Sequence, residues 1–344
     1  MKNATFTIFV TTKCNLNCTY CYEKDFHKVD MSTDVAQKTI AFIKEKIKEC
    51  GLTNILVRFH GGEAMIRFGI IKFIMDGLED NPCKVSFSMT TNATLLTKEM
   101  IPTLVRFDSL SVSIDGSEEE HNRNRVNIYG KGTYGEVCNS IAMLLEYFPR
   151  LTARMTITPD TYLKVYDNFR SIIDLGIKNV DAELDFTSDL WTNEMIAEYL
   201  EKLKRIAKYI KSEARAGISI DGSLIESAAI KTKNATCEGG ISSFSITPDG
   251  KIYPCIAVAF NDDFLLGTVE TGITNDQVLK KIEEVGNERN NQCEGCARYD
   301  YCVMTRCKII NYAYTGDFNL PKPIMCANEH IKVNIGKYLL NQTI

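Results

Sequence analysis

Three cysteines near the start of the chain have a spacing that suits a metal centre. Cys14, Cys18 and Cys21 lie on one short segment directly after an apolar, β-branched run. Cysteine thiolates are soft ligands that hold iron–sulfur clusters or zinc. Three of them leave one iron of a four-iron cluster without a protein ligand, so that a substrate or cofactor can bind there. A zinc knuckle or buried structural cysteines are the alternatives, but zinc ligands usually come as C-x2-C pairs.

A second group of cysteines occupies the C-terminal part of the chain. Its members are Cys237, Cys255, Cys293, Cys296, Cys302, Cys307 and Cys326. The first ten residues hold one lysine, an apolar alternation and no small-residue cleavage site, so we expect a strand there and not a signal peptide. In a reducing compartment, clustered cysteines bind metal more often than they form disulfides. The sequence therefore predicts a cytoplasmic protein with a second metal-binding region.

Between the two cysteine groups, short β-branched runs alternate with helical patterns. This alternation is typical of βα units around a parallel sheet. The predicted strands cover residues 6–10, 55–59, 85–90, 109–114, 154–158 and 180–186, and the clearest helix covers residues 192–213. Beyond about residue 220 the pattern changes to loop residues, cysteines and short strands at 243–247 and 251–253. We therefore expect an α/β fold with two domains, at residues 1–225 and 226–344.

Polar motifs follow several predicted strands at the point where each strand ends. Gly61, Gly62 and Glu63 follow the second strand, Asn92 follows the third, and Ser113 lies in the fourth. Glycines let a ligand approach the backbone closely, and a carboxylate suits an ammonium group. Ligand sites at the C-terminal ends of parallel strands are typical of βα barrels. The motifs predict a ligand site at that end of a barrel.

Taken together, these motifs resemble the radical S-adenosylmethionine (SAM) superfamily. The C-x3-C-x2-C spacing with Tyr20 before the third cysteine is similar to that family, as is the stretch that begins Thr91-Asn92 and has Ala93 where the family has glycine. The resemblance implies a partial (β/α)6 TIM-type barrel whose N-terminal cysteines hold a SAM-binding [4Fe–4S] cluster.

The resemblance also implies roles for individual residues. The expected SAM-binding set is Tyr20, Gly61, Gly62, Glu63, Asn92, Ser113 and Arg125. Within it, the Gly-Gly-Glu motif would receive the methionine amino group of SAM, and Ser113 and Arg125 would contact its ribose and carboxylate. An arginine suits a two-pronged carboxylate contact. A helix cap or a surface charge is the alternative explanation for these last two residues.

The C-terminal cysteines closely resemble the SPASM domain, a cysteine-rich module that carries two auxiliary iron–sulfur clusters. The family's order implies one [4Fe–4S] cluster on Cys237, Cys255 and Cys307, and another on Cys293, Cys296, Cys302 and Cys326. Ser243 stands where sulfatase-maturing relatives have a fourth cysteine for the first of these clusters. An open iron there could bind a substrate thiolate, or water or another residue could fill the position. A zinc module or a domain with a single cluster are the alternatives.

The composition excludes some classes of partner. Hydrophobic residues make up 44% of the chain and charged residues 24%, and the formal net charge is −4. The negative charge gives no electrostatic reason to bind nucleic acid or an anionic membrane surface. No apolar run approaches the ~20 residues that a membrane helix needs. We expect neither nucleic acid nor membrane as a partner.

The resemblance implies that the reduced N-terminal cluster cleaves SAM and that the resulting radical abstracts hydrogen from an unactivated carbon. The segment from Ser113 to Arg125, together with the SPASM cysteines, resembles enzymes that act on polypeptides. We therefore expect a maturase that forms a thioether or other crosslink in a ribosomally made peptide. A formylglycine-forming sulfatase maturase is an alternative, although Cys255 is followed by Ile256 where those enzymes have aspartate. A peptide epimerase and a non-catalytic electron carrier are the others.

An acidic set and the expected partners complete the prediction. Asp181, Glu183 and Asp185 alternate along the sixth predicted strand, so they would point the same way and could steer a basic peptide. A solvated strand edge is the alternative. Glu183 and Asp185 are the candidate catalytic groups. We expect a flavodoxin- or ferredoxin-type reductant. Because the triad begins at residue 14, we expect no recognition domain before the barrel, which leaves room for a separate peptide-recognition protein.

Overall fold

One sheet runs through the whole computed structural model, which describes residues 2–226 and 237–341. Within those residues its strand order is β11-β10-β9-β8-β1-β2-β3-β4-β5-β6-β7. The strands are β1 (Asn3–Thr11), β2 (Asn54–Gly61), β3 (Lys84–Thr91), β4 (Ser109–Ser113), β5 (Thr152–Ile157), β6 (Asn179–Leu184), β7 (Asp221–Gly222), β8 (Ser243–Ile246), β9 (Lys251–Tyr253), β10 (Gly267–Thr268) and β11 (Gly272–Ile273).

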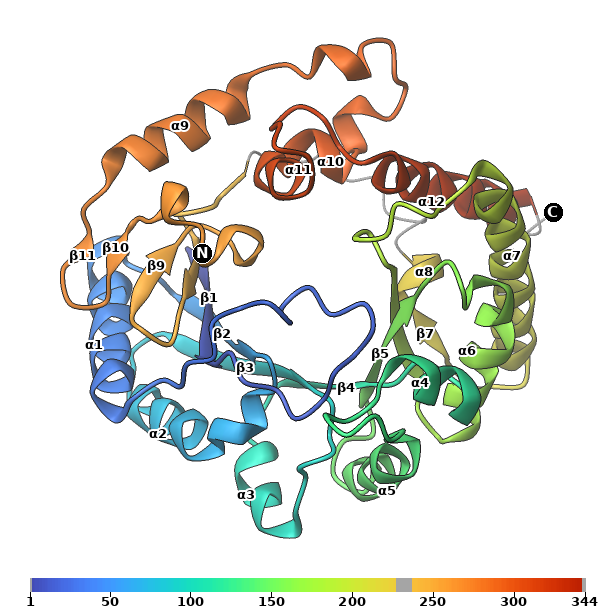
Figure 1. The fold of residues 1–344 in the computed structure, drawn as a ribbon, viewed down its shortest axis with the longest axis horizontal. Coiled ribbons are helices and arrows are strands. Elements are labelled where there is room, and N and C mark those ends of the chain that lie inside the picture. The colour runs from blue at the N-terminus through green and yellow to red at the C-terminus, as the bar shows by residue number, and fades with distance from the viewer. Residues whose placement is uncertain (1, 227–236, 342–344) are drawn as a thin grey trace.

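Helices follow most of the parallel strands and cover the outside of the sheet (Figure 1). They are α1 (Thr33–Cys50), α2 (Phe68–Glu79), α3 (Ile101–Leu104), α4 (Glu118–Asn124), α5 (Tyr134–Leu145), α6 (Val165–Asp174), α7 (Asn193–Arg215), α8 (Ser223–Glu226), α9 (Asp276–Asn287), α10 (Val303–Arg306), α11 (Lys308–Thr315) and α12 (Pro323–Asn341). The predicted helix at 192–213 corresponds to α7, whose N-cap Thr192 accepts a hydrogen bond from Met195 N.

The sheet is an incomplete barrel. Strands β1 to β7 pair in parallel in chain order, and the six strands predicted from the sequence are β1 to β6. On the other side of β1, β8 pairs with it in parallel and β9 to β11 continue antiparallel. Because β7 and β11 form the two edges, the sheet does not close, and the predicted partial barrel is confirmed.

Side chains on the two faces of the sheet differ in character. Along β5, Ala153, Met155 and Ile157 are buried against the helices, whereas the alternating Arg154 and Thr156 face the concave side and are only partly buried. Alternation of this kind follows from the two-residue period of a strand. The concave side therefore presents polar and charged groups, while the hydrophobic core lies between the strands and the outer helices.

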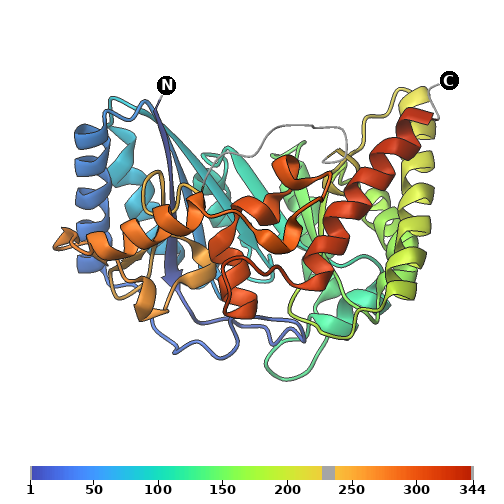
Figure 2. The same ribbon diagram turned by 90° about the horizontal axis from the view of Figure 1, so that it is seen from above.

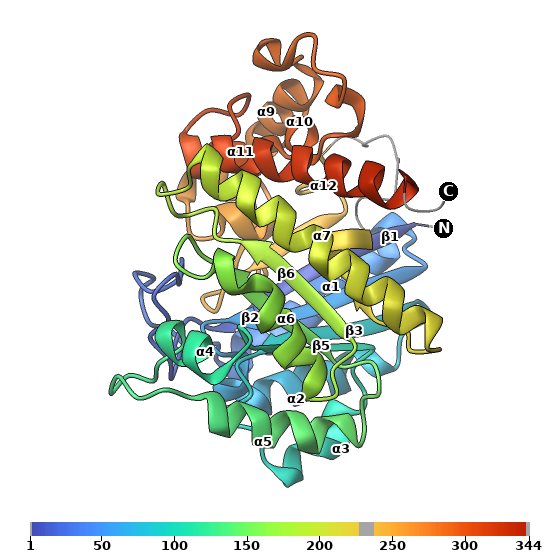
Figure 3. The same cartoon turned by 90° about the vertical axis from the view of Figure 1, so that its right-hand side faces the viewer.

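The cysteine-rich C-terminal region lies along one side of the barrel (Figure 2). Helix α12 packs against α7 (Figure 3). Lys322, just before α12, donates hydrogen bonds to Phe186 O (3.1 Å) and Thr187 O (3.0 Å) and pairs with Asp189 (2.7 Å). These contacts fasten the C-terminal region to the segment that follows β6.

The predicted domain boundary at residues 225 and 226 adjoins residues 227–236, which lie outside the described residues, and it stays a prediction. Among the residues that the structure does describe, no helix is both long enough and apolar enough to cross a membrane.

Candidate metal and cofactor site

The segment that carries Cys14, Cys18 and Cys21 leaves the C-terminal end of β1 and reaches across to α4 (Figure 1). Backbone hydrogen bonds fix its course: Asn17 N donates to Val126 O (2.7 Å) and Thr19 N donates to Asn124 O (3.0 Å). The three thiols are therefore held by contacts to a distant part of the barrel.

Cys18 and Cys21 lie close enough to Cys14 to raise its pKa. Burial is the main cause and lifts the pKa of Cys14 to about 12, and the neighbouring Cys18, Cys21 and Glu63 add to the rise. Burial also raises the pKa of Cys18 and of Cys21. A bound metal supplies the positive charge that favours thiolate here. All three cysteines are free of disulfides, so this donor set fits a cluster that needs soft ligands.

No three His, Cys, Asp or Glu side chains within residues 2–226 and 237–341 converge closely enough to hold a single metal ion. The thiolates of a four-iron cluster each bind a different iron. They therefore stand farther apart than the ligands of one ion.

The glycine motif after β2 packs directly against the cysteine segment. A Cβ on Gly61, whose φ is +148°, would lie 2.2 Å from Thr11 O, and one on Gly62 would lie 2.5 Å from Lys13 O. Glu63 N also donates to Lys13 O at 2.9 Å. Because no side chain fits at these two positions, glycine is required for the end of β2 to approach the cysteine segment.

The Glu63 carboxylate is buried and already has protein donors. Its oxygens accept hydrogen bonds from Met65 N (3.0 Å), Thr91 Oγ1 (2.8 Å) and Asn92 N (2.7 Å). Burial raises the pKa of Glu63, while these hydrogen bonds oppose the rise. In this structure the carboxylate joins the ends of β2 and β3, and its expected contact with SAM stays a prediction.

Asn92 connects the end of β3 to the cysteine segment. Its Nδ2 donates to Asn15 Oδ1 at 3.0 Å and lies 4.0 Å from Cys14 Sγ. The next residue, Ala93, has φ +58°. Ala93 thus takes the left-handed conformation that glycine adopts more easily. The turn forms although the sequence has alanine there.

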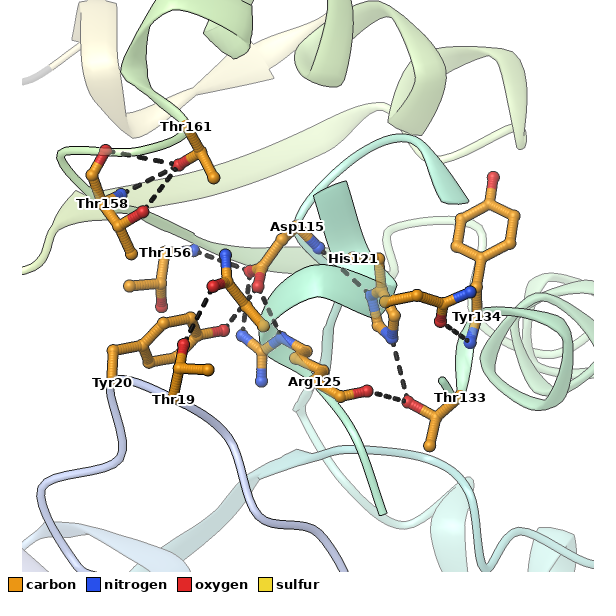
Figure 4. A network of polar contacts seen from close by, with 12 residues as sticks. Thr19, Tyr20, Asp115, His121, Arg125, Thr133, Tyr134, Thr156, Thr158 and Thr161 are labelled. Atoms are coloured by element: carbon orange, nitrogen blue, oxygen red, sulfur yellow. Dashed lines mark hydrogen bonds and ion pairs between the residues drawn. The ribbon is translucent and has the colours of Figure 1, made fainter. Parts of the chain in front are cut away.

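Figure 4 shows the polar network around Asp115, which follows β4. Asp115 is 2% exposed and accepts hydrogen bonds from Tyr20 OH (2.5 Å), Thr156 N (3.0 Å) and Arg125 Nε and Nη2 (3.0 and 3.1 Å). Arg125, expected on the carboxylate of SAM, is thus paired with Asp115 and has further N–H groups left. Ser113 ends β4 on the concave side, in register with Arg154 of β5.

His121 supports this network from behind. Its Nδ1 must be an acceptor, because the backbone N–H of Asp115 points at it from 3.5 Å. The proton then lies on Nε2, 3.1 Å from Thr133 Oγ1, and Thr133 Oγ1 in turn donates to Arg125 O at 2.9 Å. Burial and the nearby Arg125 lower the pKa of His121 to about 4, so the ring is neutral at pH 7.

The C-terminal cysteines gather in the two groups that the resemblance implies. Cys255 lies near Cys237 and Cys307, and burial raises its pKa to about 11. Cys293, Cys296, Cys302 and Cys326 line one cavity of about 30 Å³ together with Arg298 and Glu329. Burial raises the pKa of Cys302 to about 11. Ser243, at the position of the possible fourth ligand, begins β8.

The acidic residues of β6 have different surroundings. Asp181 forms an ion pair with Arg154. Asp185 accepts hydrogen bonds from Thr187 N and Oγ1 at 2.9 and 2.5 Å. Glu183 opens to solvent on the concave side, although protein atoms surround enough of its carboxylate to raise its pKa; Lys332 and Arg154 oppose the rise. Of the two candidate catalytic groups, Asp185 stabilises a local turn, whereas Glu183 has no such structural role.

Sequence reasoning missed Glu329. This residue is 4% exposed, and its carboxylate forms ion pairs with Lys332 Nζ (3.1 Å) and Arg298 Nη2 (3.6 Å). It also accepts a hydrogen bond from Val303 N at 3.3 Å. It lies near Cys302, Cys307 and Cys326 and raises the pKa of each. Its spacing of three residues from Cys326 places both on the same side of a helix, which was the one signal available in the sequence.

Two family models match this chain. One, described as the radical SAM superfamily, matches residues 8–170, and the other, described as an iron–sulfur cluster-binding domain and called SPASM, matches residues 237–297. The chain is 27% identical over 296 residues to a GTP 3',8-cyclase of Clostridium perfringens, covering 80% of this chain and 87% of the relative. It is 21% identical over 324 residues to a cysteine-type anaerobic sulfatase-maturating enzyme from the same organism, covering 84% of each.

Solved structures share the fold at low identity. The structure of anSMEcpe with bound AdoMet has a TM-score of 0.79 at 17% identity and covers 98% of each chain. Streptococcus suis SuiB bound to its precursor peptide SuiA has a TM-score of 0.63 at 16% identity, covering 94% of this chain and 76% of SuiB. These likenesses confirm the architecture of barrel and cysteine-rich region.

Proposed function

The chain belongs to the radical SAM superfamily and carries a SPASM iron–sulfur domain, and on this premise we propose that it is a peptide maturase. It abstracts hydrogen from a side-chain or α carbon of a ribosomally made peptide and forms a thioether or other crosslink. The observation that carries the proposal is the position of Glu183 and Arg154, which lie on the concave face between the two cysteine regions.

Side chains from both cysteine regions lie near these two residues. Arg154 lies near Tyr22 of the N-terminal cysteine segment, near Arg125 and near Glu183. Glu183 lies near Lys332 and Glu329 of the C-terminal region. A substrate on the concave face would therefore contact the cysteine segment that binds SAM on one side and the auxiliary cysteines on the other.

Bound SAM and a reduced cluster supply the radical that takes hydrogen from the substrate. The protein binds, orients and shields. Gly61 and Gly62 let backbone approach the cofactor closely, and the N–H groups of Arg125 that Asp115 leaves free suit a carboxylate. Glu183, with a raised pKa, can take up at its carboxylate the proton that a substrate thiol releases when the carbon–sulfur bond forms. An auxiliary cluster would accept the electron that this step leaves over.

The proposal includes three iron–sulfur clusters and two protein partners. We assign one [4Fe–4S] cluster to Cys14, Cys18 and Cys21, and two auxiliary clusters to the C-terminal cysteines. A flavodoxin- or ferredoxin-type protein supplies electrons, and a separate protein recognises the peptide. SuiB is a structural neighbour that was solved with its precursor peptide SuiA bound, which supports a peptide as the substrate class.

A formylglycine-forming sulfatase maturase is the second candidate, because the chain aligns with a sulfatase-maturating relative over 84% of each. Two residues weigh against it. Ile256 follows Cys255 where those enzymes have aspartate, and Ser243 replaces a cysteine. A three-cysteine group at Cys237, Cys255 and Cys307 leaves a position for a substrate thiolate, which favours thioether formation.

The test begins with a search for a short cysteine-rich reading frame beside the gene. The mass of the peptide it encodes is then measured after anaerobic incubation with SAM and reconstituted, reduced protein. We expect a loss of two hydrogens per modified site together with 5′-deoxyadenosine. An unchanged peptide mass with 5′-deoxyadenosine present would overturn crosslinking in favour of epimerisation. Conversion of a cysteine to formylglycine would favour the second candidate.

A further inference from the structure

Asp115 connects three separate parts of the barrel through one buried carboxylate (Figure 4). Its hydrogen-bond donors are Tyr20 OH in the cysteine segment, Thr156 N in β5, and Arg125 Nε and Nη2 just after α4. Four donors saturate the lone pairs of a carboxylate. The Asp115 carboxylate is therefore fixed in place, and it has no capacity left for a ligand.

Arg125 is held between this carboxylate and the cysteine segment. It is 7% exposed, and its guanidinium carbon lies 5.3 Å from the centre of the Tyr20 ring. The hydrogen bond from Thr19 N to Asn124 O (3.0 Å) joins the residue after Cys18 to the residue before Arg125. The charge of Arg125 lies near the Cys18 thiol and opposes the rise in its pKa that burial causes. A buried cation thus lies close to the N-terminal triad.

We propose that the Asp115–Arg125 ion pair sets the reduction potential of the metal centre on Cys14, Cys18 and Cys21. Arg125 and Asp115 are positioning residues in this role. The inference rests on the proposed function, because it requires that the triad holds an iron–sulfur cluster. It goes beyond that function in assigning to Arg125 an effect that exists before SAM binds.

The physical basis is the charge that reduction adds. One electron makes the cluster and its thiolates more negative, and a cation beside Cys18 stabilises that state, as do hydrogen bonds to the cluster sulfurs. Because the site is buried, the surrounding protein screens the interaction less than water would. Asp115 opposes Arg125, so the two charges act on the cluster with opposite sign.

The experiment is an anaerobic redox titration of the reconstituted full-length protein, followed by electron paramagnetic resonance without SAM. The signal of the N-terminal cluster is identified in parallel samples as the one that changes when SAM is added. Since the titration itself contains no SAM, a lost contact between Arg125 and SAM cannot cause a shift.

Arg125→Gln should make one-electron reduction about tenfold less favourable, a fall of about 59 mV. Asp115→Asn leaves the cation uncompensated and should shift the same potential upward. Arg125→Lys keeps the charge and should stay within about threefold of the wild type. The matched control is Arg123→Gln, two residues away, because the Arg123 side chain is exposed and its ion pairs are with Glu119 and Glu120 of its own helix, not with Asp115.

Opposite shifts in Arg125→Gln and Asp115→Asn support the proposal, because simple loosening of the site would move both variants in the same direction. Equal shifts in one direction, unchanged potentials, or an Arg125→Lys shift as large as that of Arg125→Gln would overturn it. Wild-type protein that takes up no iron at the triad would instead contradict the proposed function itself.

Discussion

The two cysteine regions are built differently. The N-terminal segment is held by contacts from distant parts of the chain. Thr19 bonds to the last residue of α4, Asn17 bonds to the backbone just after α4, and Tyr20 bonds to Asp115, 95 residues away. The C-terminal cysteines lie among short turns with many local bonds, such as Cys296 N to Cys293 O at 3.1 Å, and with fewer long-range bonds, such as Val303 N to Glu329 at 3.3 Å. The barrel therefore organises the first site before metal binds, whereas metal itself should order much of the second.

The buried charges differ as well. A cation, Arg125, lies near Cys18 in the first site and opposes the rise in its pKa. An anion, Glu329, lies near Cys302, Cys307 and Cys326 in the second, with Lys332 and Arg298 as its counter-ions. Charge next to a cluster is one of the means by which a protein adjusts its reduction potential. We therefore expect the clusters of the two sites to differ in reduction potential.

Removal of iron should give the largest effect, because it tests which region depends on metal. After chelation, amides around Cys293, Cys296 and Cys302 should exchange hydrogen about tenfold faster or more, while those of β1 and β2 stay protected. Hydrogen exchange read by mass spectrometry on the holo and apo proteins measures this. Equal loss of protection at Asn17 and Thr19 would show that the N-terminal site depends on metal as much as the C-terminal one does.

Substitution of Glu183 tests the group between the two regions. Glu183→Gln should lower peptide product formation by about 100-fold or more, the usual contribution of a general base, while SAM binding stays unchanged. Rates of peptide product, measured beside the affinity for SAM, separate the two effects. The control is Asp185→Asn, whose carboxylate stabilises its own turn. A similar loss in both variants would argue against a proton-holding role for Glu183.

The pH dependence of stability tests whether protein contacts hold the N-terminal site. His121 has a pKa of about 4 when folded, below the ~6.5 of an unfolded histidine. Its stabilising contribution is present above pH 6.5 and is lost as the pH falls towards 4, by about 3 kcal/mol. Denaturant unfolding of the apo protein should show this loss, and His121→Gln should remove it. An identical pH profile in the variant would exclude the effect.

The smallest expected effect concerns the turn at Ala93. Its φ of +58° costs an alanine about 1–2 kcal/mol, so Ala93→Gly relieves strain but loses a buried methyl group. We expect its free energy of unfolding to change by less than about 1 kcal/mol. Ala93→Val should lose about 2 kcal/mol or more, because β-branched residues tolerate positive φ poorly. Thermal unfolding of the two variants measures the difference; equal stability would show that the turn is not strained.

The barrel was readable from the sequence because its strands are long enough to show a period. The six predicted runs became β1 to β6, and the helix predicted at 192–213 became Asn193–Arg215. Strands β7, β10 and β11 have two residues each, which is too few to show a two-residue period. Their formation depends on pairing with neighbouring strands. Local pattern therefore sufficed where elements are long.

The site was only partly readable. The family resemblance assigned each cysteine to a cluster from its order and spacing along the chain. The partners of Asp115 could not be foreseen, because Tyr20 and Thr156 approach it only after β4 and β5 pair. Likewise the sequence predicted that Asp181 could help to steer a basic peptide, yet Arg154 on the neighbouring strand pairs with it. Contacts across strands depend on register, which sequence alone leaves open.

The most direct measurement is 5′-deoxyadenosine formation by anaerobically reconstituted, reduced protein in three forms. They are the wild type, the variant Cys14→Ala/Cys18→Ala/Cys21→Ala, and the variant Cys293→Ala/Cys296→Ala. We expect the first variant to fall to background, and the second to keep forming 5′-deoxyadenosine while losing peptide product. If the first variant formed it at the wild-type rate, the N-terminal triad would not be the centre that cleaves SAM.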